Sequence, residues 1–154
     1  MNLYEKALNI AKEAHKGQKQ KDNVTPYIEH PIFVASLVTS EKEKAVALLH
    51  DVIEDTNITL EELKKAGLPT DVIEAVSILT KQPKSSYFDY IEKVKTNPLA
   101  KKIKLVDLYH NSDITRIPNP SENDYKRFKK YQRAIKFLND REFTSFREYE
   151  DNLK

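Results

Sequence analysis

Apolar residues recur at helical spacing along almost the whole chain, and no stretch alternates between polar and apolar residues as a half-buried strand would. The chain has only two glycines in 154 residues, a composition that favours long helices over tight turns. A chain of this length buries a sizeable core as one domain. We therefore expect an all-α bundle of about seven to nine helices that forms a single domain over residues 1–154.

Local start and stop signals place the individual helices. Ser40 with Glu43 and Thr59 with Glu62 match the capping box that opens a helix, and Pro98 suits a first helical turn. The expected helices are 2–16, Pro31 to Val38, a central helix from Ser40 through the mid-fifties, Thr59 to Ala66, Thr70 to Leu79, Tyr87 to Lys95, a long helix from Pro98 that ends before Pro118, Asn123 to Leu138, and a short one from Phe143 to Tyr149.

Composition narrows the functional classes. Charged residues make up 32% of the chain, but the formal net charge is only +2, so general attraction to nucleic acids or membranes is not expected. There are no cysteines, which excludes disulfides and thiolate metal sites and is compatible with a reducing cytoplasm. No apolar run approaches the length of a membrane span, and none resembling a signal peptide follows Met1. We expect a soluble cytoplasmic domain, and the sequence does not indicate its oligomeric state.

The central helix ends in a group of ionisable residues. Its apolar stripe is followed by His50 and Asp51 and, about one turn later, by Glu54 and Asp55. An imidazole beside a carboxylate suits a divalent transition metal, and crowded carboxylates at the end of an apolar helix are costly unless a cation compensates them. The alternative is a solvated helix end with no ligand.

Two further segments supply groups of the same kind. His30 lies in a segment whose backbone is fixed by Pro26 and Pro31, and Asp107 lies on the long helix that begins at Pro98. Two imidazoles and two carboxylates can hold one divalent ion and leave room for water. This reasoning makes ligands of His30, His50, Asp51 and Asp107. It places Glu54 and Asp55 on the side of the water, where a carboxylate can orient the water or take its proton.

Four segments together resemble the HD superfamily: His15–Gln18, Pro26–Pro31, His50–Thr56 with its His-Asp-Val-Ile-Glu-Asp-Thr sequence, and Lys104–Asn111. Within that superfamily the chain resembles the hydrolase domain of RelA/SpoT-type alarmone enzymes and small stand-alone bacterial HD proteins. The resemblance extends from Leu3 to Leu138.

The resemblance implies a fold, a cofactor and a reaction. It implies an all-α fold and a divalent metal, usually manganese, with the same four ligands and with Glu54 and Asp55 handling the hydrolytic water. Asn111 matches a position that contacts the nucleotide. The implied reaction removes pyrophosphate from the 3′ position of guanosine tetra- or pentaphosphate.

The chain departs from the alarmone hydrolases at two positions. Those enzymes carry an Arg-Lys pair that holds the nucleotide, and this chain has Gln20-Lys21 at the corresponding place. They also carry an arginine directly after the ligand aspartate, and this chain has Leu108 there. Lys19 and Lys21 can hold phosphates, or they belong to a solvated loop. The departures leave open another nucleotide substrate, or a non-catalytic nucleotide- or partner-binding module with a relic metal site.

Two aromatic residues near these motifs have open roles. His15 fits either a packed position at a helix end or a place in the site, and Tyr27 is expected in the core rather than against a base.

Overall fold

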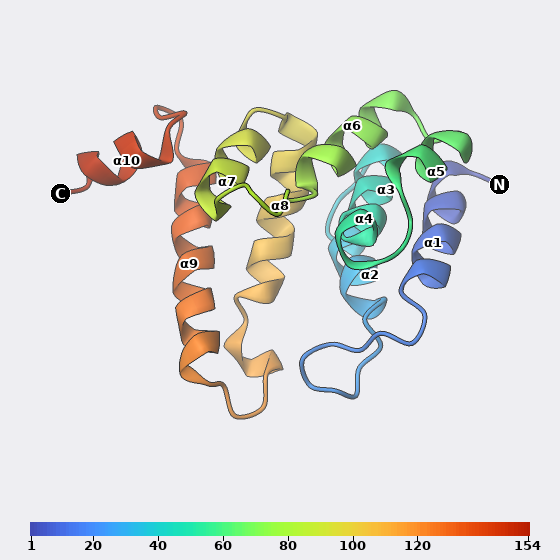
Figure 1. The fold of residues 1–154 in the computed structure, drawn as a ribbon, viewed down its shortest axis with the longest axis horizontal. Helices are drawn as coiled ribbons and strands as arrows, with labels where there is room; N and C mark the ends of the chain where they lie inside the picture. The colour runs from blue at the N-terminus through green and yellow to red at the C-terminus, as the bar shows by residue number, and fades with distance from the viewer. The chain divides into compact units, whose positions relative to one another are not determined.

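The computed structural model describes residues 1–154, and all its regular elements are helices apart from an isolated bridge between Lys19 and Pro26 (Figure 1). The predicted all-α class is confirmed, and the nine helices other than the single-turn α4 agree with the predicted count. The chain divides into two compact units, Met1–Thr80 and Lys81–Lys154. The assignment of one domain to the whole chain stays a prediction.

The N-terminal unit, blue to green in Figure 1, is built around α3. Its helices are α1 (Leu3–Ala14), α2 (Glu29–Ser36), α3 (Glu41–Leu49), α4 (Val52–Asp55), α5 (Leu60–Lys65) and α6 (Thr70–Leu79). α1, α2 and α6 all pack on α3, and every residue from Ala45 to Leu49 is fully buried. The second half of α3 is thus apolar on every side, as expected of a helical segment inside a bundle. Each fully buried leucine contributes about 1.5–3 kcal/mol relative to exposure.

Caps fix where these helices begin. The Ser40 hydroxyl accepts from the Glu43 amide and the Glu43 carboxylate accepts from the Ser40 amide, which confirms the predicted capping box. Thr59 accepts from the Glu62 amide at the start of α5. Because α3 begins at a fixed residue, the position of its last turn and of His50 after it is also fixed.

The central helix is not continuous, which corrects the sequence prediction. α3 ends at Leu49, and Asp51, with φ −107° and ψ 0°, separates it from α4. The apolar period runs on through Val52, which is fully buried, so the sequence gives no sign of the interruption. The Asp55 amide still donates to the Asp51 carbonyl (3.0 Å), so one helical turn links the His-Asp pair to α4.

The C-terminal unit comprises α7 (Tyr87–Lys95), α8 (Pro98–Asn111), the 3-10 turn η1 (Ile114–Arg116), α9 (Glu122–Asn139) and α10 (Phe146–Asn152). α8 and α9 pack together, and α7 contacts both (Figure 1). Asn97 caps α8 by accepting from the Ala100 amide, with Pro98 at the first position as predicted. None of the helices is both long enough and apolar enough to cross a membrane.

Candidate metal centre

His30 is held where two helices meet in the N-terminal unit. It is the second residue of α2, and its side chain is 1% exposed. Its amide donates to the Tyr27 carbonyl (3.0 Å), and Pro31, which follows it, is buried as well. Its ring lies 5.3 Å from the His50 ring in an edge-on arrangement. The predicted proximity of these two imidazoles, 20 residues apart in the sequence, is present in the structure.

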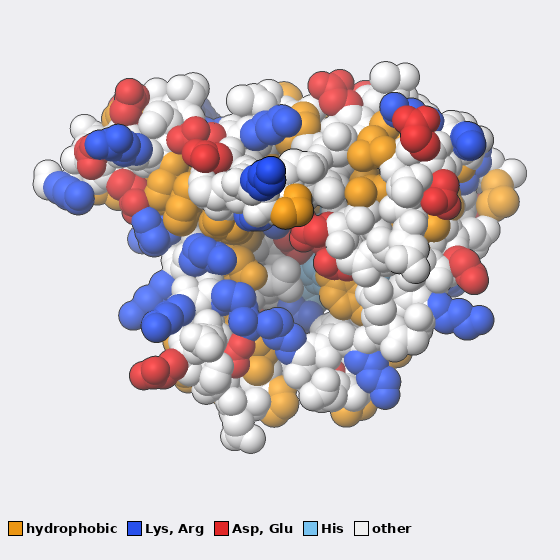
Figure 2. All heavy atoms as spheres, in the orientation of Figure 1, with side chains coloured by type: hydrophobic (Ala, Val, Ile, Leu, Met, Phe, Trp, Pro, Cys, Tyr) orange, Lys and Arg blue, Asp and Glu red, His pale blue; other side chains and the backbone are white.

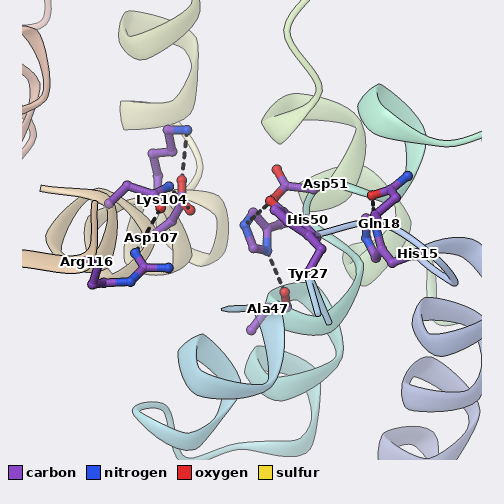
Figure 3. Close-up of polar contacts among 10 residues, drawn as sticks. His15, Gln18, Tyr27, Ala47, His50, Asp51, Lys104, Asp107 and Arg116 are labelled. Carbon is purple, nitrogen blue, oxygen red and sulfur yellow. Dashed lines mark hydrogen bonds and ion pairs between the residues drawn. The ribbon is translucent and has the colours of Figure 1, made fainter. Parts of the chain in front are cut away.

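His50, which ends α3, presents a defined ring nitrogen. Its Nδ1 lies 2.5 Å from the Ala47 carbonyl oxygen (Figure 3). A carbonyl only accepts, so Nδ1 carries a proton, and in the neutral imidazole Nε2 is then the nitrogen that can act as a ligand. This Nε2 lies 3.0 Å from Asp51 Oδ2. Two acceptor atoms this close require a proton or a cation between them, which is the arrangement expected of a metal site.

Tyr27 orients Asp51, a role that the sequence analysis did not assign to it. Its hydroxyl donates a hydrogen bond to Asp51 Oδ2. Its ring lies 4.9 Å from His15 and 5.7 Å from His30, so it packs between two imidazoles. The expectation that Tyr27 belongs to the core is therefore incomplete, because its ring is only partly buried and its hydroxyl holds a candidate ligand.

The donor set in the N-terminal unit fits a divalent metal. His30, His50 and Asp51 each offer one ligand atom, and these atoms lie within 4.8 Å of one another. Nitrogen and carboxylate ligands each lie about 2.0–2.2 Å from a zinc-sized ion, so ligand atoms that share an ion must lie within roughly twice that distance of one another. Mixed imidazole and carboxylate ligands suit first-row divalent ions.

Glu54 and Asp55 lie on α4, and their side chains are exposed. α4 is a single turn, and two of its carbonyls accept hydrogen bonds from side chains. The Thr56 hydroxyl donates to the Val52 carbonyl (2.5 Å), and the Gln18 amide nitrogen donates to the Asp55 carbonyl (3.0 Å). The carboxylates predicted to handle water are thus accessible to solvent on a short, tethered element.

His15 is buried, with 2% of its surface exposed, and its Nδ1 lies 2.8 Å from the Gln18 side-chain oxygen. Its Nε2 is buried without a hydrogen-bond partner. Burial lowers the pKa of His15 below 6.5, although the Gln18 hydrogen bond opposes this effect. Of the two readings of His15, the structure supports a packed position at a helix end that is also bonded to Gln18.

The loop that carries Lys19, Gln20 and Lys21 is ordered by its own hydrogen bonds. Asp22 accepts from the Val24 and Thr25 amides (both 2.9 Å), and the Gln20 amide donates to the Thr25 carbonyl (2.8 Å). The side chains of Lys19 and Lys21 are exposed, and Gln20 is half-buried.

Asp107 is a buried carboxylate within the C-terminal unit, 3% exposed on α8. Lys104 Nζ lies 3.0 Å from its Oδ2 (Figure 3). Asn111 Nδ2 donates to its Oδ1 (3.0 Å). Asn111, predicted to contact a nucleotide, therefore also orients the predicted ligand Asp107. Leu108, the second departure from the alarmone hydrolases, is 1% exposed and contributes to the core.

Basic side chains gather on the same unit. Figure 2 shows lysine and arginine side chains collected over α9. Lys130 on α9 lies 4.4 Å above the Tyr87 ring. Burial, followed by the charges of Arg127, Lys104 and Lys81, lowers its pKa below 10.5. Several cations within electrostatic range of one another favour an anionic ligand.

An all-helical fold with a His-Asp pair beside a second buried histidine defines the class of this protein. A family model described as "HD domain" matches residues 7–104, and the chain belongs to that family.

Among curated proteins, the chain is similar to guanosine-3′,5′-bis(diphosphate) 3′-pyrophosphohydrolase MESH1 of Xenopus tropicalis, with 50% identity over 60 residues that cover 34% of each chain. The human protein of the same name is 44% identical over 61 residues, 35% of this chain and 34% of that one. The bacterial guanosine-3′,5′-bis(diphosphate) 3′-pyrophosphohydrolase of Borreliella burgdorferi is 46% identical over 57 residues, 34% of this chain and 8% of that one. The match thus spans about a third of the length of the first of these relatives.

Among solved structures, the chain resembles one described as "A metazoan ortholog of SpoT hydrolyzes ppGpp and plays a role in starvation responses". The TM-score is 0.75 and the sequence identity 26%, over 90% of this chain and 85% of that one.

Proposed function

We propose that the chain is a metal-dependent phosphohydrolase that acts on a phosphorylated nucleotide. The observation that carries this proposal is the convergence of His30, His50 and Asp51, whose ligand atoms lie within 4.8 Å of one another. The contact of His50 Nδ1 with the Ala47 carbonyl and the hydrogen bond from Tyr27 to Asp51 orient two of these side chains, which supports the proposal.

We assign Asp107 as the fourth ligand. Its residue type, its burial and its place in the Lys104–Asn111 motif support this assignment. An unpaired buried carboxylate is costly, and Lys104 and Asn111 offset that cost in the metal-free chain. Manganese is the ion we expect, and such an ion supplies Lewis acidity at a phosphoryl oxygen and lowers the pKa of water.

Glu54 and Asp55 perform the proton chemistry in this proposal. Both are exposed to solvent on α4, in the same unit as the three clustered donors and directly after the His-Asp pair in sequence. One carboxylate accepts the proton of the attacking water and the other orients that water. Tyr27 holds Asp51 in place for the ion. In this proposal Asp51 binds the ion, whereas Glu54 and Asp55 handle the protons.

Guanosine 3′,5′-bis(diphosphate), losing its 3′-pyrophosphate, is the best single substrate candidate. The similar proteins of Xenopus tropicalis and Borreliella burgdorferi are named for this activity, which supports the choice. Lys19 and Lys21 are exposed cations that can hold its phosphates, while Gln20 and Asn111 offer hydrogen bonds to the nucleoside.

A second candidate is another nucleotide with a similarly placed phosphate. Gln20 favours it, because an amide provides neither the charge nor the planar donor fork of the arginine expected at that position. A non-catalytic module with a relic site is the third reading. It gives no role to Glu54 and Asp55, which are both present at the end of the motif.

The test is a screen for phosphate and pyrophosphate release over a panel of nucleotides, with manganese present. Guanosine 3′,5′-bis(diphosphate) should release pyrophosphate, and the Asp51→Asn variant should release none because it loses the ion. Release that is equal in the presence of a chelator would contradict a metal-dependent reaction.

A further inference from the structure

The single-turn helix α4 depends on contacts from outside itself. An isolated helix of this length is far below the length that is stable in water, and the last carbonyls of any helix lack partners within it. Thr56 covers one of these carbonyls from within the segment, by donating to Val52. The Asp55 carbonyl is covered by Gln18, which is 37 residues away in the sequence.

Gln18 is itself rigidly placed. Its amide donates to the His15 carbonyl (3.0 Å), and its own carbonyl accepts from the Tyr27 amide (2.8 Å). Gly17, with φ +84°, permits the reversal after α1 that brings Gln18 back toward the helix end. Because the Gln18 backbone is held through both its amide and its carbonyl, the Gln18 side chain is anchored and can fix the position of the group that it contacts.

The hydrogen-bond directions in this group are fully determined. The Gln18 amide nitrogen donates to the Asp55 carbonyl, so its oxygen faces His15 Nδ1 and accepts (Figure 3). His15 is 2% exposed, and its ring stacks at an angle on Tyr27, 4.9 Å away. A buried imidazole fixed in one tautomer therefore holds Gln18 in one rotamer.

We propose that Gln18 is a positioning residue whose amide, held by His15, fixes the end of α4 and thereby aims Glu54 and Asp55. This inference rests on the proposed function, since it gives those carboxylates their proton role. Gln18 touches neither the substrate nor the candidate ligands in this account. It acts through the main chain of Asp55.

The first experiment measures hydrogen–deuterium exchange, which does not depend on activity. Gln18→Leu removes both hydrogen bonds at similar volume, and loss of a bond of about 1 kcal/mol should raise exchange of the amides in residues 52–58 about five- to tenfold. Gln18→Glu keeps an acceptor for His15 but cannot donate to Asp55, so it should raise exchange in the same segment. Gln82→Leu makes the same chemical change on an exposed loop and should leave this segment unchanged.

The second experiment separates positioning from folding and from metal binding. Gln18→Leu should lower kcat about 10–100-fold, the usual effect of losing an orienting partner. KM and manganese affinity, measured by calorimetry, should remain near the wild-type values. His15→Phe keeps the ring packing but loses the donor, and the double variant with Gln18→Leu should be little worse than the worse single variant, because the two residues act as one unit.

Several outcomes would overturn the proposal. Unchanged exchange in both Gln18 variants would show that the Asp55 bond does not hold α4. Loss of manganese in Gln18→Leu would show that Gln18 supports the ligands instead. Multiplicative losses in the double variant would show that His15 acts separately. If the wild type releases no phosphate or pyrophosphate from any nucleotide, the proposed function fails, and the exchange comparison still decides whether Gln18 fixes α4.

Discussion

Replacing Tyr27 with phenylalanine should weaken both the metal site and the fold. The change removes only the hydroxyl that donates to Asp51 Oδ2 and keeps the ring between His15 and His30. Hydrogen bonds to charged groups contribute about 1.5–3 kcal/mol. The Asp51 side chain is 19% exposed, so water can replace the lost donor in part. We therefore expect the free energy of unfolding without metal to fall by about 1.5 kcal/mol, at the lower end of that range.

The same change should weaken manganese binding about tenfold, because the freed carboxylate must be ordered again when the ion binds. Urea denaturation of the metal-free protein gives the first quantity and calorimetric titration with manganese gives the second. Tyr149→Phe is the matched control, since it removes a hydroxyl from a ring that packs against Phe137 and Phe146 in the C-terminal unit. Wild-type manganese affinity in Tyr27→Phe would refute the claim that Tyr27 orients Asp51.

Three further predictions concern single residues. Burial lowers the pKa of His15 below 6.5 in the folded chain. As the pH falls, His15 is therefore protonated in the unfolded chain at a higher pH than in the folded chain. Stability should fall as the pH drops below about 6.5, by up to about 1.4 kcal/mol per pH unit, and urea denaturation of His15→Phe should show a shallower slope than wild type. Glu54→Gln should retain manganese and lose turnover by about 10²–10⁴-fold, whereas Asp51→Asn should lose both; equal metal loss would make Glu54 a ligand. Gln20→Arg should lower KM for guanosine 3′,5′-bis(diphosphate) more than it raises kcat, since contacts to a distant base mostly provide uniform binding. A wild type with a low KM for that nucleotide and no turnover of others would contradict the idea that Gln20 weakens nucleotide binding.

Local signals in the sequence were sufficient for most of the fold. α7 and α8 begin at the predicted residues Tyr87 and Pro98, because capping side chains and an N-terminal proline act within a few residues of the helix start. The separation of α3 from α4 was not predictable in this way. The apolar period continues through Val52, and nothing in the pattern marks the altered backbone at Asp51.

In the candidate site, too, some features were predictable from local sequence patterns and others were not. His30, His50 and Asp51 were predictable because their residue types follow motifs with recognisable spacing. The bonds from Tyr27 to Asp51 and from Gln18 to Asp55 join residues 24 and 37 positions apart, so no local pattern contains them. The one available signal was their position beside motif residues, with Tyr27 preceding His30 and Gln18 following His15.

The most direct test of the central claim is pyrophosphate release from guanosine 3′,5′-bis(diphosphate) by manganese-loaded wild type and Glu54→Gln, with the metal content of the same samples measured. We predict that both proteins carry stoichiometric manganese and that only the wild type releases pyrophosphate at an appreciable rate. A wild type that carries manganese but hydrolyses neither this nucleotide nor any other in the panel would contradict it, and would leave a metal-bearing module without the proposed activity.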